Sequence, residues 1–315
     1  MIPRIRAIAA AFIFLLAVTI LAGAVDADES RIRVGAIDAW LTIPSGTEQP
    51  PVALLIAGSG STDHDGNGPQ VKPATLKKLS DALVARGIAT LRYDKRGAGG
   101  WKPDYGKPED FRFKDYVDDA AALVTYLRAG AKFSRIIVIG HSEGGLVGIL
   151  TARRIPVDKL VLLAVAARKQ GDLLKAQLEK KLPPDKFAAV AKAIDSIMAG
   201  EIVDPPPPGL AIPPPLQPGI ASAFSEDPIP PLQKIEEPIL IVAGGKDSQL
   251  ARVDFLALTT AAFAAKTLWL PEMNHALVDV SDEADDLAAY NQPERPLDAD
   301  MIEAVADFIK TKSER

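Results

Sequence analysis

The stretch RIIVIGHSEGG, residues 135–145, joins a continuous apolar run to a serine flanked by glycines. Such a run is typical of a strand that is buried on both faces of a parallel sheet. The pattern G-x-S-x-G, placed after a strand and before a helix, predicts a sharp turn that exposes the hydroxyl of Ser142 at the carboxyl end of the sheet. Ser142 is therefore the candidate nucleophile.

Similar apolar runs recur on both sides of this stretch, and helical patterns separate most of them. The alternation predicts an α/β fold in which helices cover both faces of a mostly parallel sheet. Residues 31–44 alternate loosely between apolar and polar and predict an antiparallel edge pair. The other expected strands span residues 52–57, 88–93, 159–164, 238–243 and 267–271. The expected helices span residues 76–86, 113–129, 146–154, 253–265 and 300–310.

A long interval before the expected strand at 238–243 breaks the alternation and predicts an insertion. Helical segments are expected at 172–182 and 185–198, before a proline-dense stretch at 205–218. Because proline fixes φ and lacks an N–H, we expect that stretch to be an extended surface strap, neither helix nor strand. A docking motif for a proline-reading partner is the alternative. The predicted domains are a core of residues 31–166 and 235–315 and an inserted cap of residues 167–234.

The first residues have the layout of a secretory signal, with two arginines before an almost uncharged apolar run that ends in small residues. We predict a signal peptide, residues 1–24, that is cleaved after Ala24, and export to the periplasm or the medium. Residues 26–29 would then form an exposed mature start, with no stable membrane insertion. An uncleaved anchor is the alternative, because the run is only slightly shorter than a spanning helix.

The composition excludes several classes of protein. Of the 315 residues 48% are hydrophobic and 24% are charged, which is sufficient for a sizeable core. The net charge of -5 is spread along the chain without a long basic run, so we expect no nucleic-acid partner. The chain has no cysteine, which excludes disulfides and thiolate metal sites.

A serine hydroxyl becomes a good nucleophile when a base removes its proton, and three histidines are available. Where the serine lies on a strand-turn-helix turn, the acid follows it in the chain and the histidine follows the acid, each on a loop after a strand. His64 lies upstream, and His141 adjoins the serine and is expected to point away along the turn, whereas His275 follows the last expected strand. His275 is therefore the predicted base. An ordinary surface histidine is the alternative.

The imidazole needs a carboxylate that fixes its tautomer and stabilises the imidazolium. Asp247 follows a buried strand directly and precedes His275, as the chain order requires. Asp227 and Asp254 are the rivals, and an N-cap role is the alternative for Asp247.

A tetrahedral intermediate carries a negative oxygen that needs N–H donors already aimed at it. We predict the backbone N–H of Glu143, directly after the nucleophile, as one donor. The loop after the strand at 52–57 should supply the other, and Ser59 is its best candidate. The acidic segment 63–68 in the same loop copies half of a calcium loop, but Ala74 stands where a bidentate Glu is needed, so no metal is expected.

The chain resembles the α/β-hydrolase superfamily, and within it an esterase-like group, exported or cytoplasmic, related to serine aminopeptidases and dienelactone hydrolases. The shared motifs are AGSG at 57–60, DHDGN at 63–67, RYDKRG at 92–97, GHSEGG at 140–145, GKDSQ at 245–249 and Asn274-His275. The resemblance implies a cofactor-independent hydrolase that acts on small-molecule acyl esters through an acyl-enzyme on Ser142. Hydrolysis of a peptide, a thioester or a lactone is the alternative, and a binding module that has lost turnover is a further one.

Overall fold

The computed structural model describes residues 26–312, so the predicted signal peptide, residues 1–24, lies outside the described residues. Within residues 26–312, no helix combines the length and the apolar character that a membrane crossing requires.

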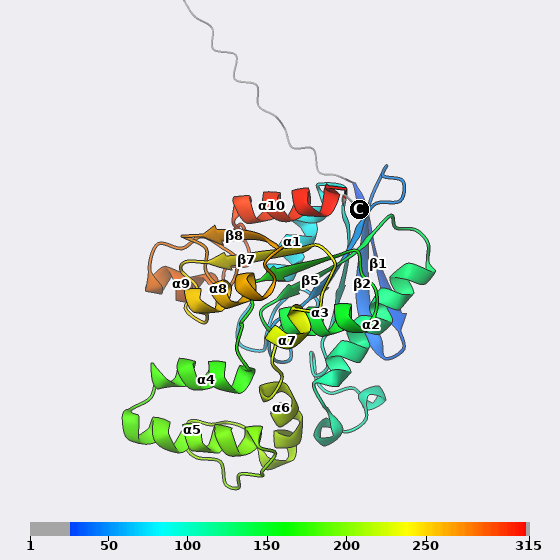
Figure 1. The fold of residues 1–315 in the computed structure, drawn as a ribbon. Helices are drawn as coiled ribbons and strands as arrows, with labels where there is room; N and C mark the ends of the chain where they lie inside the picture. Colours follow the sequence, from blue (N-terminus) through cyan, green and yellow to red (C-terminus); the bar gives the residue numbers. More distant parts are fainter. Residues whose placement is uncertain (1–25, 313–315) are drawn as a thin grey trace, which may run out of the picture.

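The described chain folds around one eight-stranded sheet of order β1-β2-β4-β3-β5-β6-β7-β8 (Figure 1). β1 and β2 pair antiparallel, as do β2 and β4, and all other neighbours are parallel. The strands are β1 Ala27–Val34, β2 Ile37–Pro44, β3 Val52–Ile56, β4 Ala89–Tyr93, β5 Ile136–His141, β6 Lys159–Leu163, β7 Ile239–Gly244 and β8 Lys266–Leu270. The predicted α/β-hydrolase architecture, with a mostly parallel sheet, is confirmed.

The apolar runs form strands because both of their faces meet a hydrophobic core. In β3, Leu54 belongs to one core cluster, whereas its neighbours Ala53 and Leu55 belong to the cluster on the opposite face. All three side chains are fully buried. An alternating polar residue would leave an unpaired group in one of these cores, and this explains why the run is continuous.

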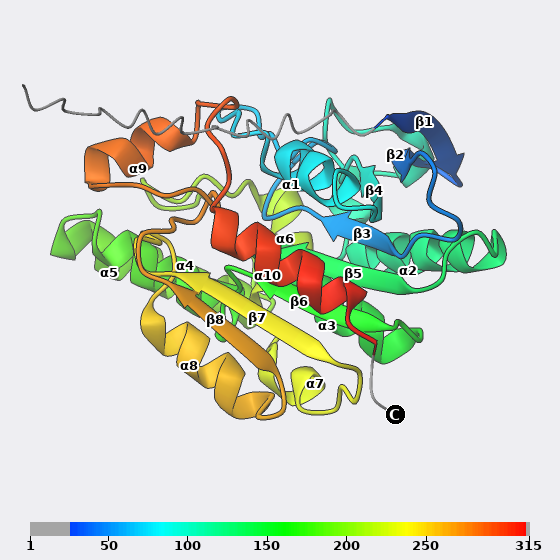
Figure 2. The ribbon, with the colours of Figure 1, turned by 90° about the horizontal axis from the view of Figure 1, so that it is seen from above.

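Helices cover both faces of the sheet (Figures 1 and 2). One face packs against α1 Thr75–Val84 and α10 Ala299–Lys310. The other packs against α2 Lys114–Ala129, α3 Glu143–Arg154, α7 Ile229–Leu232 and α8 Arg252–Ala261. The remaining core elements are α9 Glu283–Ala289 and the 3₁₀ turns η1 Pro103–Tyr105 and η2 Pro108–Asp110.

The N-terminal edge strand begins earlier than predicted. Residues 26–29 are exposed, as expected, but β1 already begins at Ala27 and pairs with β2 as far as Pro44. The side chain of Glu29 accepts hydrogen bonds from Thr42 and Arg92. Backbone pairing with β2 forms this strand although its side chains are exposed, so it lacks a hydrophobic signature.

The inserted segment contributes α4 Gln170–Glu179, α5 Pro184–Met198 and α6 Gln217–Phe224, which lie together beside the core in Figure 1. We call these three helices and their connections the cap. The cap has a small hydrophobic cluster of its own, centred on Val190, Ile194 and Ile197. The side chain of Ser222 on α6 accepts from the Phe113 N–H, which ties the cap to the core.

The proline-dense stretch was expected to be extended throughout, but part of it is helical. Pro214–Leu216 forms the 3₁₀ turn η3, and α6 begins at Gln217 with Pro218 in its first turn. Proline is tolerated there because the first helical N–H groups have no partner within the helix. Leu210 is buried in the cap cluster, so the stretch also contributes to packing.

Candidate active site

Ser142 lies on the turn between β5 and α3, with φ 55° and ψ -125°. This left-handed φ is unfavourable for a residue with a side chain, and the glycines around it allow the turn to close. A Cβ atom at Gly140 would lie 2.2 Å from the Gly144 carbonyl oxygen, and one at Gly144 would lie 2.2 Å from that of Ile56. One at Gly145 would lie 2.2 Å from Val165. Close packing around the turn therefore requires glycine at these three positions.

The structure brings the three predicted residues together. His275 Nε2 lies 3.0 Å from Ser142 Oγ, and His275 Nδ1 lies 2.7 Å from Asp247 Oδ2. The side chains of His275 and Asp247 are 6% and 3% exposed, so water competes little for these bonds. This geometry allows the imidazole to take the serine proton while the carboxylate holds the ring in one orientation.

Asp247 is held by its own loop as well as by the histidine. Its Oδ1 accepts from the N–H groups of Gln249 and Leu250, at 2.8 and 2.9 Å. Burial acts to raise the pKa of Asp247, but the His275 ring and these N–H donors outweigh it and lower the pKa below its usual value. The carboxylate thus stays ionised beside the imidazole.

The alternatives to Asp247 lie elsewhere. α8 is capped at Ala251, so Asp247 is not its N-cap. Asp254 is buried and pairs with Arg168, while Asp227 accepts from the Ile229 N–H at 2.9 Å. Neither carboxylate contacts His275 in the part of the chain that the structure describes.

His141 is a neighbour of the triad whose position the sequence reasoning missed. It was expected to point away along the turn, but its Nε2 lies 2.8 Å from the backbone oxygen of His275. Burial lowers the pKa of His141 to about 4, and the nearby His275 adds to this effect. A neutral His141 therefore donates to the His275 carbonyl and supports the histidine loop.

The predicted oxyanion donors flank the nucleophile. Ser59 and Glu143 line the same cavity as Ser142 and His275. Among the described residues, neither of their backbone N–H groups donates to another group of the protein. A free pair of N–H groups beside Ser142 is the arrangement that an oxyanion requires.

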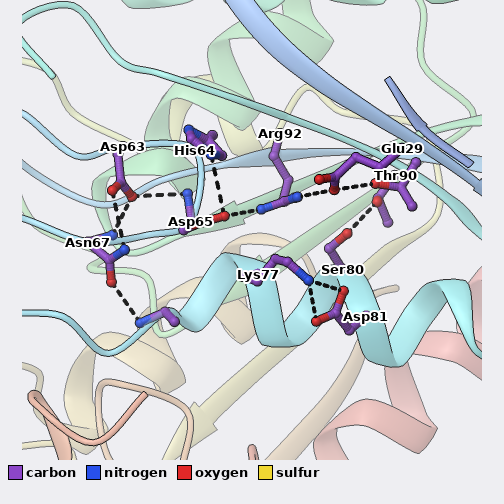
Figure 3. A network of polar contacts seen from close by, with 12 residues as sticks. Glu29, Asp63, His64, Asp65, Asn67, Lys77, Ser80, Asp81, Thr90 and Arg92 are labelled. Carbon is purple, nitrogen blue, oxygen red and sulfur yellow. Dashed lines mark hydrogen bonds and ion pairs between the residues drawn. The ribbon is translucent and has the colours of Figure 1, made fainter. Parts of the chain in front are cut away.

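Side chains of the loop itself hold the segment behind Ser59 (Figure 3). Asp63 Oδ1 accepts from the N–H groups of Asp65 and Asn67, and Asn67 Oδ1 accepts from the Ala74 N–H. Buried Arg92 pairs with Asp65. The loop is thus held by its own Asp and Asn side chains and by an ion pair to β4.

Two cavities meet at Ser142 and His275. The larger one, of about 320 Å³, lies between core and cap. Its apolar lining includes Leu173, Leu174 and Phe224 from the cap and Leu146 and Val165 from the core. The smaller cavity, of about 170 Å³, lies toward the histidine loop and includes Thr62, Ala276 and Tyr290. A group bound at Ser142 therefore has separate space on each of its two sides.

Known hydrolases resemble this chain. Residues 72–198 match the family described as Serine aminopeptidase, S33. The chain resembles the α/β-hydrolase superfamily and has its fold. Esterase EstD of Thermotoga maritima is 25% identical over 256 residues, which are 80% of this chain and 60% of that protein. The chain thus spans about 60% of the length of this relative.

Solved α/β-hydrolases share the fold at low identity. Est1E from Butyrivibrio proteoclasticus is 18% identical, with a TM-score of 0.55 over 90% of this chain and 99% of that chain. Proline iminopeptidase of Mycobacterium smegmatis is also 18% identical, with a TM-score of 0.53 over 90% and 97%. These likenesses concern the fold, which serves enzymes named for different reactions.

Proposed function

We propose that this α/β-hydrolase cleaves carboxylic esters through an acyl-enzyme on Ser142. The supporting observation is the continuous chain of contacts from Asp247 through His275 to Ser142, at 2.7 and 3.0 Å, beside two cavities. His275 takes the Ser142 proton as Oγ attacks the carbonyl carbon, and it then gives that proton to the leaving alcohol. Water then attacks the acyl carbon while His275 takes its proton. His275 returns that proton to Ser142 Oγ as the carboxylic acid leaves.

The acyl group is proposed to occupy the larger cavity. Its charged lining groups are already paired, because Glu143 contacts Lys95 and Arg168 contacts Asp254. With these partners and the apolar residues around them, the cavity favours an uncharged acyl chain. Its volume of about 320 Å³ favours a short or medium chain. The leaving alcohol is assigned to the smaller cavity, next to the histidine that protonates it.

The alternative reactions are peptide, thioester or lactone hydrolysis, and the same three residues serve all of them. An aminopeptidase needs a carboxylate for the substrate ammonium, and the carboxylate that lines the larger cavity, Glu143, is already paired with Lys95. This pairing favours the ester reaction. A binding module without turnover would have no need for the free N–H groups beside Ser142.

A substrate panel tests the proposal. Chromogenic esters of rising acyl length are compared with aminoacyl anilides, and an organophosphonate probe is applied to the same protein. We expect ester turnover well above anilide turnover, labelling of Ser142, and loss of both in Ser142→Ala. Faster anilide cleavage would favour the peptidase alternative, and labelling at another serine would contradict the site.

We also propose that the protein is exported and that residues 1–24 are removed. The order of basic, apolar and small residues at the start of the sequence supports this proposal. N-terminal sequencing of protein from the periplasmic fraction should begin at Val25. An intact Met1, or recovery with the membranes, would favour the uncleaved anchor.

A further inference from the structure

Lys95 follows β4, and its side chain is fully buried beneath the active-site loops. Its Nζ donates to the carbonyl oxygen of Gly58 at 2.7 Å and to Glu143 Oε1 at 2.6 Å. It also lies 4.2 Å from the centre of the Tyr116 ring. Because removing an ion pair from water costs free energy that the attraction often fails to recover, stability alone is a weak explanation for this lysine.

The first contact controls the direction of one oxyanion donor. The Gly58 carbonyl and the Ser59 N–H belong to the same trans peptide unit, in which C=O and N–H point in opposite directions. An ammonium that holds the carbonyl on the buried side leaves the N–H on the other side, where Ser59 lines both cavities. A flip of this peptide would direct an oxygen toward the developing oxyanion.

The second contact concerns the other donor. Glu143 supplies its backbone N–H from the first position of α3, while its side chain is 8% exposed and bonded to Lys95. One ammonium group therefore links Glu143 to Gly58, whose carbonyl shares a peptide unit with the Ser59 N–H. Gly58 follows β3 and Glu143 follows β5, so Lys95 joins the segments that leave these two strands.

The main chain of Lys95 also takes part. Its N–H donates to the Thr62 carbonyl at 3.1 Å, and the Thr62 hydroxyl donates to the Ser59 carbonyl at 3.1 Å. The peptides on both sides of Ser59 thus have fixed carbonyls, one through the Lys95 side chain and one through Thr62. The Ser59 N–H therefore has little freedom to turn away from the cavities.

We propose that Lys95 is a positioning residue that keeps the N–H groups of Ser59 and Glu143 aimed at the oxyanion. The inference rests on the proposed ester hydrolysis and deepens it. Burial lowers the pKa of Lys95, but the Glu143 carboxylate and Tyr116 outweigh burial and raise it, so the ammonium stays charged. Its loss should weaken binding of the transition state and leave binding of the substrate nearly unchanged.

Lys159 provides a matched control. It is 2% exposed, its Nζ donates to the backbone oxygens of Phe308 and Thr311, and it lies 4.8 Å from the centre of the Phe308 ring. It begins β6, whereas Ser142 follows the carboxyl end of β5. Lys159→Met therefore removes a buried, doubly bonded ammonium far from the oxyanion loops.

The test compares wild type, Lys95→Met, Lys95→Met/Glu143→Gln and Lys159→Met with a preferred ester. The double variant avoids an unpaired buried carboxylate, so it remains informative where the single variant fails to fold. An active-site titration normalises kcat to folded protein. A boronate analogue of the tetrahedral intermediate and an unreactive amide analogue of the substrate serve as competitive inhibitors.

For the Lys95 variants we expect kcat to fall about 10²-fold, which is the effect of removing one oxyanion donor. KM should stay within about threefold of the wild-type value. Boronate affinity should fall in parallel, amide affinity should stay constant, and Lys159→Met should keep its kcat. A folded Lys95 variant with unchanged kcat and boronate affinity, or an equal loss in Lys159→Met, would overturn the inference. Absence of ester turnover in wild type would instead overturn the proposed function, and with it this inference.

Discussion

The core and the cap of this molecule are built in different ways. In the core, β3, β4 and β6 are buried along their whole length, and Ser142, Asp247 and His275 all lie on loops that leave the carboxyl ends of strands. In α4 of the cap, by contrast, Gly171 alone is fully buried along the described helix. This difference fits the proposed function, in which the core carries the chemistry and the cap shapes the acyl cavity.

Asp247→Asn tests the core half of this comparison. An amide at this position cannot hold the imidazole in the same way or stabilise the imidazolium, so we expect kcat to fall about 10²- to 10⁴-fold with the fold intact. Circular dichroism and ester kinetics measure both quantities. Asp227→Asn, in the connection between α6 and α7, is the control and should retain activity. Near-normal turnover of the Asp247 variant would assign the acid to another residue.

Leu173→Trp tests the cap half. Leu173 lines the larger cavity from α4, and a larger ring there leaves less space for an acyl chain. We expect kcat/KM for the longest accepted ester to fall about tenfold or more relative to acetate, because each lost methylene contact changes selectivity by roughly 10- to 200-fold. Glu179→Trp, at the exposed end of the same helix, controls for the added tryptophan. An unchanged chain-length profile would place the acyl group outside this cavity.

His141→Gln gives a smaller effect, on stability. The pKa of His141 is about 4 in the folded protein and 6.5 in its ordinary state. Between these values the unfolded chain binds a proton that the folded chain does not, so stability falls as the pH drops from about 6.5 toward about 4. One such proton corresponds to a slope of up to about 1.4 kcal/mol per pH unit.

Urea midpoints at several pH values, for wild type and His141→Gln, measure this slope. The glutamine amide is able to donate to the His275 carbonyl without titrating, so its stability should vary less between pH 6.5 and pH 4. Parallel curves for the two proteins would show that His141 does not carry the pH dependence.

The sequence predicted those features that leave a local pattern. Continuous apolar runs identified β3 to β8, and the G-x-S-x-G turn with the chain order of the acid and base identified the residues that the structure brings together. The contact of His141 and the proposed role of Lys95 depend on contacts across 134 and 48 positions of the chain, and no local pattern reports such packing.

The sequence pattern gave a wrong secondary structure in two places, the start of β1 and the proline-dense stretch. The start of β1 is polar and exposed, and its strand conformation comes from pairing with β2. The proline-dense stretch was predicted to be extended, although proline also suits the first turn of η3 and α6. At β1 the paired strand decides the structure, whereas in η3 and α6 the prolines begin short helical turns.

Trapping of the acyl-enzyme tests the central claim most directly. The protein is mixed with excess nitrophenyl ester, quenched in acid within the first turnover, digested and examined by mass spectrometry. We expect a burst of about one nitrophenol per active site and the acyl mass on the peptide that contains Ser142. An unmodified Ser142 peptide during steady turnover, or the acyl group on another residue, would contradict the account.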